Sequence, residues 1–158
     1  MNPVSNVPAI PKGYTSVTPY LIVHDAKAAL AFYQAAFGAQ IEVQLNAPDG
    51  SIAHAEIRVG NAVIMLGQET TEGGQTFQSP RTLKGTATSI MLYVPDCDAT
   101  FAAAIAAGAT LLEPVSLKFY GDQAGRLQDP FGHQWTVATH VEDVAQADIE
   151  RRLAALYN

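Results

Sequence analysis

The sequence has few of the features that mark secreted, membrane or nucleic-acid-binding proteins. Its single cysteine, Cys97, cannot form a disulfide within the chain, which suits a reducing compartment. Lys and Arg total 9 against 15 Asp and Glu, for a net charge of −6, and the basic residues form no cluster. Nucleic acid and anionic membranes are therefore poor partners. No apolar run reaches the roughly 20 residues that span a bilayer, and residues 1–12 do not read as a signal peptide. We expect a cytoplasmic protein.

The sequence does contain a repeat. Residues 21–25 (Leu-Ile-Val-His-Asp) precede an Ala-rich helical run that ends at Gly38, and residues 92–96 (Leu-Tyr-Val-Pro-Asp) precede another that ends at Gly108. In each copy a β-rich segment ends at an Asp, which can cap the following helix, and a Gly closes that helix. The chain of 158 residues is 48% hydrophobic, enough apolar material for one domain or two small fused modules.

Turn residues and hydrophobic periodicity divide the chain into five segments. We expect an N-terminal arm at 1–13, a first module at 14–69, a polar and Gly-rich linker at 70–86, a second module at 87–140, and an amphipathic helical tail at 141–158. The expected strands of each module follow and precede a helix, which indicates an α+β protein.

The clearest local prediction is a hairpin of strands 51–59 and 62–68 around the turn Gly60-Asn61. If Val59 faces Ala62, one face of the hairpin is wholly apolar and must cover a helix. Glu56 then lies across from Met65 on the opposite face, which is mixed in character.

The alternation of apolar and polar residues also predicts which side chains of the first strand in each copy face the helix. In the strand predicted over 16–24, Leu21 faces the helix whereas Tyr20 and Ile22 face away. In the strand predicted over 87–94, Met91 and Tyr93 face away from the helix. We take Tyr20 and Tyr93 as equivalent positions of the two copies.

Several motifs resemble those of the glyoxalase/bleomycin-resistance superfamily, also called vicinal oxygen chelate proteins. Phe32-Tyr33 stands inside the first helix, and Asp129-Pro130-Phe131-Gly132 precedes the last strand. Further segments are similar to the PhnB-like branch, namely 19–21, 32–39, 48–50, 54–56, 119–122, 129–135 and 138–143. The resemblance covers about the whole chain beyond the arm. It implies one domain over 14–145, in which two βαβββ modules form curved mixed sheets around a cleft, with helices outside. It also implies a homodimer.

Metal enzymes of this superfamily place a His or Glu on the first and last strands of each unit. The motifs locate those four positions at Thr18, Met65, Ser89 and Thr136. Hydroxyls and a thioether are poor ligands for the zinc, nickel or iron that His and Glu bind. The resemblance therefore implies the fold without its usual metal site, and we expect no cofactor. A divalent metal at another position stays as the alternative.

His54 and Glu56 are candidate catalytic residues, because their spacing places both side chains on the same strand face as Met65. The alternatives are a polar patch that sets the register, or a solvated face on which Glu56 pairs with Arg58.

Other side chains on these faces are candidate ligand-binding residues. An aromatic and thioether-lined pocket suits a flat or apolar organic molecule, although the same side chains could simply fill the cleft. The candidates are Tyr20, Ile22, Met65, Met91, Tyr93 and Thr136, with Tyr120 and Arg126 near the loop that enters the last hairpin.

Arg126 could hold a carboxylate or phosphate of the ligand, but we favour a salt bridge to Asp122 or Asp129. His140, Glu142 and Asp143 follow the last strand and resemble a metal cluster, but we interpret them as a strand end and a helix cap that could contact a dimer partner. His24 and His133 are interpreted as surface residues. Asp96 and Asp98 should raise the pKa of Cys97, which argues against a nucleophile.

Two functional hypotheses follow. The first is a homodimeric small-molecule-binding protein that holds a flat or apolar organic ligand without the usual metal. The alternative is a glyoxalase-like lyase or isomerase, or a dioxygenase-type enzyme, that uses Glu56 and His54 with or without a displaced metal.

Overall fold

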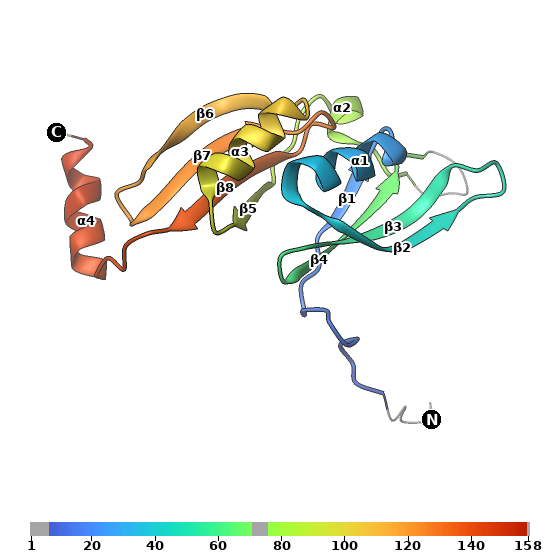
Figure 1. Cartoon of the computed structure of the whole chain (residues 1–158), viewed down its shortest axis with the longest axis horizontal. Coiled ribbons are helices and arrows are strands. Elements are labelled where there is room, and N and C mark those ends of the chain that lie inside the picture. Colours follow the sequence, from blue (N-terminus) through green and yellow to red (C-terminus); the bar gives the residue numbers. More distant parts are fainter. Residues whose placement is uncertain (1–6, 71–75, 158) are drawn as a thin grey trace.

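The computed structural model describes residues 7–70 and 76–157. It contains two βαβββ modules in succession (Figure 1). The start of the expected arm (1–6) and the middle of the expected linker (71–75) lie outside the described residues.

Both modules have the same strand order. The first comprises β1 (Tyr20–Val23), α1 (Ala26–Phe37), β2 (Gln40–Asn46), β3 (Ile52–Val59) and β4 (Ala62–Gln68). The second comprises β5 (Ser89–Tyr93), α3 (Cys97–Ala106), β6 (Thr110–Leu117), β7 (Asp122–Gln128) and β8 (Gln134–His140). The sheet orders are β1-β4-β3-β2 and β5-β8-β7-β6, with a parallel pair at one edge and antiparallel pairs elsewhere. The α+β fold of two mixed, unclosed sheets is confirmed.

The helix boundaries follow the capping residues. The side chain of Asp25 accepts a hydrogen bond from the Ala28 amide at the start of α1, and Asp96 accepts one from the Ala99 amide at the start of α3. Gly38 ends α1 with a φ of 64°, a left-handed conformation that suits glycine.

The hairpin register is confirmed. Val59 pairs with Ala62, and Glu56 pairs with Met65. Gly60 has a φ of 57°, as the first central residue of the expected turn requires. The apolar face of the hairpin is buried beneath α1, since Ile57 and Leu66 are fully inaccessible.

The first strand is shorter than predicted. Only Tyr20–Val23 is β-strand, whereas residues 16–19 are not. Pro19 has no amide hydrogen to donate to a ladder, although its carbonyl still accepts a hydrogen bond from the Met65 amide. The predicted phase is confirmed, because Leu21 is buried and Tyr20 is 48% exposed.

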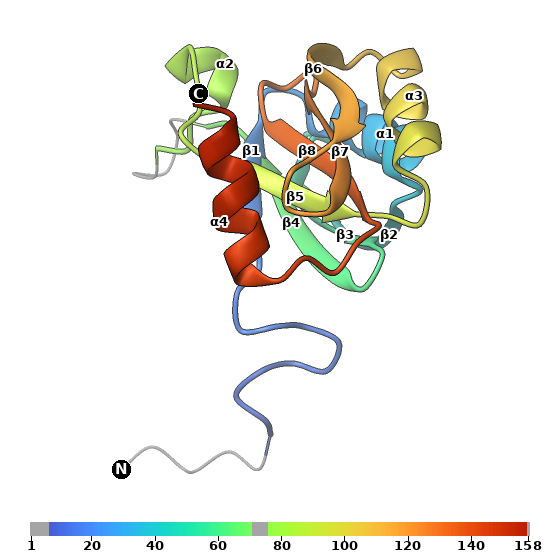
Figure 2. The ribbon, with the colours of Figure 1, turned by 90° about the vertical axis from the view of Figure 1, so that its left-hand side faces the viewer.

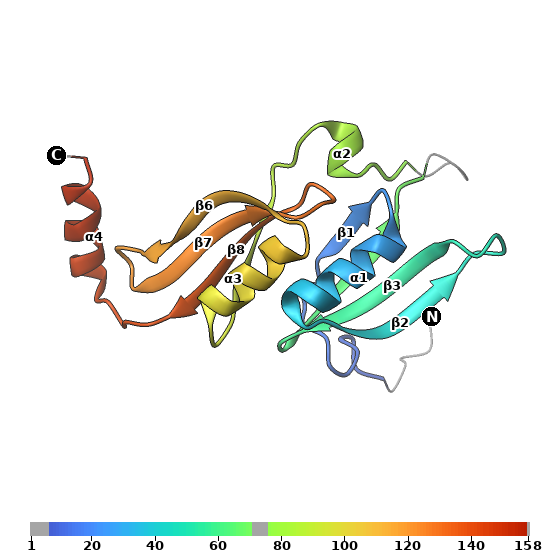
Figure 3. The same cartoon turned by 45° about the horizontal axis from the view of Figure 1, so that its top comes forward.

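Helices α1 and α3 contact one another and lie on the same side of the two sheets (Figure 3). The core lies between these helices and the sheets and includes Tyr33, Phe101 and Trp135. The opposite faces of the sheets carry partly exposed side chains, among them Met91 at 46% and Tyr93 at 57%. Those open faces are where a ligand could enter.

The described residues at the end of the connection, 76–86, are more ordered than a polar linker. They include the short helix α2 (Pro80–Leu83), whose N-cap residue Ser79 is fully buried. Glu69 accepts hydrogen bonds from the Ser79 amide and the Thr82 hydroxyl. These polar contacts, invisible to hydrophobic periodicity, hold the segment against the first module.

The tail ends in helix α4 (Gln146–Ala155), which lies beyond the second sheet at one end of the molecule in Figure 1 and stands in front of the sheets in Figure 2. None of its residues is buried. β8 ends at His140, as expected, but the helix cap expected from Glu142 or Asp143 is wrong, because the N-cap residue of α4 is Ala145, without a side-chain hydrogen bond. In the described part of the chain, no helix has the length and apolar character needed to cross a membrane.

Candidate functional site

A groove of about 510 Å³ lies where edge strand β1 of the first sheet approaches edge strand β5 of the second. It falls within the volume range of small-molecule sites. Two hollows of similar volume lie beside α1, but neither is lined by any of the predicted site residues. The lining of the groove is Val17, Pro19, Tyr20, Leu21, Thr86, Thr88, Ser89, Ile90, Met91, His133 and Gln134.

Two rows of paired residues cross the open sheet faces toward this groove, one in each module. They are Glu56, Met65 and Tyr20 in the first sheet, and Arg126, Thr136 and Met91 in the second. Tyr20 and Met91 are therefore equivalent positions. The assignment of Tyr20 and Tyr93 as equivalents is wrong, because Tyr93 pairs with Ala138, one pleat further along β5.

A hydrogen-bonded network surrounds Glu56 at the outer end of the first row. The residue is only 8% exposed, and its carboxylate accepts a hydrogen bond from the Tyr14 hydroxyl. The other carboxylate oxygen lies 3.2 Å from Nε2 of His54, and Nδ1 of His54 lies 3.1 Å from the Tyr20 hydroxyl. The bond from Tyr14 lowers the pKa of Glu56, which favours the charged carboxylate.

The structure thus brings His54, Glu56 and Tyr20 together, as the strand phases predicted. Tyr14 was not expected, since it belongs to a Pro-rich segment without periodicity, 42 residues from its partner. The alternative pairing of Glu56 with Arg58 is wrong. Arg58 instead makes two hydrogen bonds to Glu42, on the neighbouring strand β2.

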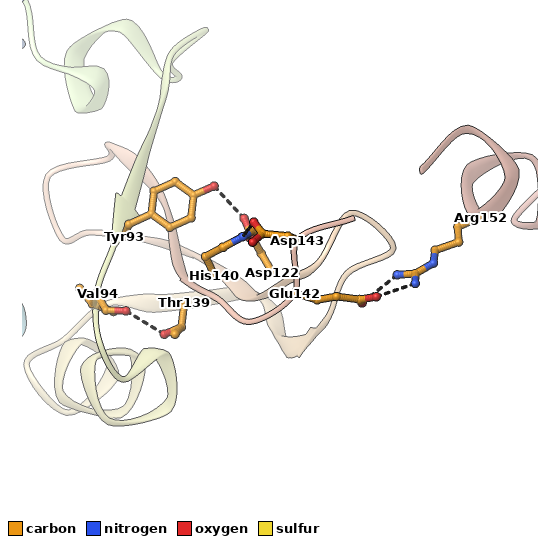
Figure 4. Close-up of polar contacts among 8 residues, drawn as sticks. All are labelled: Tyr93, Val94, Asp122, Thr139, His140, Glu142, Asp143 and Arg152. Atoms are coloured by element: carbon orange, nitrogen blue, oxygen red, sulfur yellow. Dashed lines mark hydrogen bonds and ion pairs between the residues drawn. The ribbon is translucent and has the colours of Figure 1, made fainter. Parts of the chain in front are cut away.

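A second network lies on the open face of the second module (Figure 4). Asp122 is 2% exposed, accepts a 2.7 Å hydrogen bond from the Tyr93 hydroxyl, and lies 2.7 Å from Nδ1 of His140. Nε2 of His140 lies 2.9 Å from Asp143. Asp143 and Asp122 together raise the pKa of His140, because both carboxylates accept hydrogen bonds from the protonated ring.

Arg126 does not form the salt bridge that we favoured from the sequence. Asp122 is occupied by Tyr93 and His140, while Asp129 accepts hydrogen bonds from Tyr33 and Trp135. Arg126 is exposed and donates a 3.1 Å hydrogen bond to the side-chain oxygen of Gln134. Because Gln134 lines the groove, this contact places the guanidinium beside it.

The remaining expected residues are spread over the open faces. Ile22, Met65 and Thr136 are half-buried and flank the groove without lining it, whereas Tyr93 and Tyr120 lie outside its lining. Burial raises the pKa of Tyr120, whose ring packs edge-on against Phe119.

Two histidines and the cysteine are also placed by the structure. His133 is not simply a surface residue, because its Nε2 lies 2.9 Å from the Ile22 carbonyl of the other module. Nδ1 of His24 is also buried, although both histidines as whole residues are half-buried, so neither is purely a surface residue. Burial and then Asp98 raise the pKa of Cys97, in the expected direction.

The residues expected at the superfamily's metal positions have side chains that do not suit its metal. Met65 and Thr136, each at the centre of a row, offer a thioether and a hydroxyl. Within residues 7–70 and 76–157, no group of three or more His, Cys, Asp or Glu side chains is arranged to hold a metal ion. Around His140, the two ring nitrogens point to different carboxylates, so their donors do not converge on one point.

Together these features define a class: a two-module α+β protein with a ligand-sized groove where the modules meet. A family model described as the Glyoxalase/Bleomycin resistance protein/Dioxygenase superfamily matches residues 14–137. The chain belongs to that superfamily.

The chain is also similar to a curated protein and to solved structures. An uncharacterized protein of Mycobacterium bovis, Mb0911c, is 34% identical over 142 residues, which cover 89% of this chain and 93% of that protein. The crystal structure of TioX from Micromonospora sp. ML1 has a TM-score of 0.64 at 24% identity, over 80% of this chain and 99% of TioX. A PhnB protein of Bacillus cereus has a TM-score of 0.61 at 19% identity, over 79% and 99% of the two chains. Both solved structures share the fold.

Proposed function

We propose that this protein binds a flat or apolar organic molecule in the groove between β1 and β5, without the metal of the superfamily's enzymes. The observation that carries the proposal is the pair of half-exposed side chains at the inner ends of the two rows. Tyr20 is 48% exposed and Met91 is 46% exposed, and both line the groove. An aromatic ring and a thioether from opposite walls suit a planar ligand, because the ring stacks and the thioether adapts its shape.

A homodimer is part of this proposal. The open faces leave Tyr20, Met91 and Tyr93 about half exposed, and large apolar side chains gathered on one face favour association. A second copy placed over these faces would also exclude water from the groove.

The proposal is tested with a neutral planar probe, naphthalene-2-carboxamide, by isothermal titration calorimetry. We expect the wild-type protein to bind it, and Tyr20→Ala and Met91→Ala each to weaken binding by about tenfold or more, the scale of one lost apolar contact surface. Tyr157→Ala is the control, because Tyr157 is exposed at the end of the tail. Equal binding by all four proteins, or none at millimolar concentration, would overturn the proposal.

The second candidate function is proton transfer by His54 and Glu56, favoured by the observation that His54 lies within hydrogen-bonding distance of both Tyr20 and Glu56. A histidine held between a hydroxyl and a carboxylate is suited to move a proton. The test is exchange of the C–H protons of hydroxyacetone in D2O, followed by NMR. Exchange that is catalysed by the wild-type protein and lost in His54→Gln would support an enzyme over a binding protein.

A further inference from the structure

We propose that the ligand of the groove is an apolar acid, whose anionic group is bound by the guanidinium of Arg126 while its hydrocarbon part lies against Met91 and Tyr20. This inference rests on the proposed function, since it names the ligand class of the same groove.

The first argument is position. Arg126 on β7, Thr136 on β8 and Met91 on β5 are successive partners across the second sheet. Neighbouring strands lie about 4.8 Å apart, so the backbone of Arg126 stands about 10 Å from that of Met91. All three side chains point away from α3, because the alternate residues Leu127, Trp135 and Val137 are buried in the core. A ligand seated at Met91 therefore has Arg126 at the end of the same row.

The second argument is available hydrogen-bonding capacity. A guanidinium carries five N–H donors, and in the described part of the chain Arg126 makes one side-chain hydrogen bond, to Gln134. Two carboxylates near Arg126 have other hydrogen-bond partners. Glu113, its cross-strand partner on β6, binds Lys118, although the nearby guanidinium also contributes to lowering the pKa of Glu113. Asp122 binds Tyr93 and His140. Arg126 therefore keeps a pair of donors that fits a carboxylate or phosphate in two-point geometry.

The third argument is orientation. Gln134 lines the groove, and its side-chain oxygen accepts a 3.1 Å hydrogen bond from Arg126. An amide that accepts from one guanidinium nitrogen restricts the rotation of the whole planar group. The contact thus holds the charge at the groove wall.

Glu56, at the outer end of the row in the first module, explains why we expect an acid and not a base as the ligand. Glu56 is the equivalent of Arg126 in the first module, but the residue is only 8% exposed and its carboxylate already contacts Tyr14 and His54. It has little capacity left for a ligand cation. None of the residues that line the groove is Asp, Glu, Lys or Arg, and the exposed guanidinium of Arg126 lies beside it through Gln134.

The experiment compares two probes of nearly the same shape, naphthalene-2-carboxylate and naphthalene-2-carboxamide, by isothermal titration calorimetry at neutral pH and low salt. The proteins are wild type, Arg126→Gln and the control Arg151→Gln. Arg151 is exposed on α4, where it pairs with Asp148, so its replacement makes the same change in net charge at a distant site.

We expect the wild-type protein to bind the carboxylate about tenfold or more tightly than the amide, the scale of one charge-assisted contact. In Arg126→Gln the preference should vanish while amide binding is unchanged, and in Arg151→Gln it should persist. A wild-type protein that binds both probes equally, or a preference that survives Arg126→Gln, would overturn this inference and leave the proposed function standing. Binding of neither probe would overturn both. Loss of amide binding in Arg126→Gln would assign Arg126 a structural role and would also overturn the inference.

Discussion

The hydroxyl of Tyr33 donates a 2.7 Å hydrogen bond to Asp129, a residue 96 positions away in the other module. Both residues are buried. Asp129 also accepts hydrogen bonds from the indole N–H of Trp135 and from the amides of Phe131 and His133. The Asp-Pro-Phe-Gly turn of the second module is thereby anchored to the first helix, and this places β1 beside β5 along the groove.

Tyr33→Phe tests this link. The substitution removes one donor from a buried carboxylate and should lower the free energy of unfolding by about 1.5–3 kcal/mol, the scale of a hydrogen bond to a charged group. Urea denaturation followed by circular dichroism measures it. Tyr157→Phe, at an exposed position, should have no measurable effect. Equal stability of Tyr33→Phe and wild type would show that the bond contributes nothing.

Leu21→Ala and Tyr20→Ala should separate stability from binding. Leu21 is 5% exposed in the core, and its truncation should cost about 2–5 kcal/mol. The neighbouring Tyr20 faces the groove, so Tyr20→Ala should destabilise the fold less. Chemical denaturation of the two variants decides the point. A larger loss from Tyr20→Ala would mean that its ring fills the groove as part of the core.

Gly121→Ala should destabilise the protein by more than about 2 kcal/mol, the cost of a strained backbone together with a steric clash. Gly121 has a φ of 99°, and a β-carbon there would stand 2.1 Å from the Glu142 carbonyl oxygen. Both Val141 and Glu142 donate their amides to the Gly121 carbonyl, so the tail should also shift.

Gly50→Ala is the matched control for this substitution. Gly50 has a similar φ of 85°, but a β-carbon there would meet nothing within 4 Å. Urea denaturation, together with limited proteolysis of the tail, should show the larger effect at Gly121. If both substitutions lower the free energy of unfolding equally, the contact with Glu142 does not explain the effect at Gly121.

His140 should make stability depend on pH. Its folded-state pKa is raised above the ordinary 6.5 by Asp143 and Asp122. A raised pKa gives a stabilisation that is fully present below the unfolded-state value and is lost as the pH rises through the folded-state value. The stability advantage of wild type over His140→Gln should therefore shrink as the pH rises from below 6.5 into the alkaline range. Denaturation midpoints across this range measure it.

The contact between His140 and Asp143 can also be tested by measuring the pKa of His140. Asp143→Asn removes one carboxylate from the ring and should lower the pKa of His140, observed in the NMR shifts of its ring protons. An unchanged titration in Asp143→Asn would exclude the contact seen in Figure 4.

The protein should be a homodimer. The half-exposed Tyr20, Met91 and Tyr93 on the open faces, and the uncovered apolar side chains of α4, need a partner surface. Light scattering at micromolar concentration should give twice the mass of the chain. A monomer across the whole range would contradict this expectation.

Local features of the fold could be predicted from the sequence. The repeat, the caps Asp25 and Asp96, and the pairing of Glu56 with Met65 all depend on residues close in the chain. Capping is a contact between near neighbours, and the side-chain period of two makes a one-residue slip bury polar groups. Such patterns specify helix ends and strand faces without knowledge of the rest of the molecule.

The resemblance to the superfamily also predicted the two βαβββ modules. It could not predict which side chains contact one another. Arg126 illustrates the limit. From the sequence we predicted a salt bridge between Arg126 and its neighbours Asp122 or Asp129. Both carboxylates instead contact side chains of other strands and of α1.

The sequence by itself thus determined which residues face the helices and which face away, because that choice depends on periodicity alone. Only the tertiary structure decided that Tyr14 reaches Glu56, that Tyr33 reaches Asp129, and that Arg126 contacts Gln134 at the groove. Two of these contacts join residues 42 and 96 positions apart. The third depends on which acceptors are already occupied, and polar groups take the partners that packing of the whole chain brings within reach.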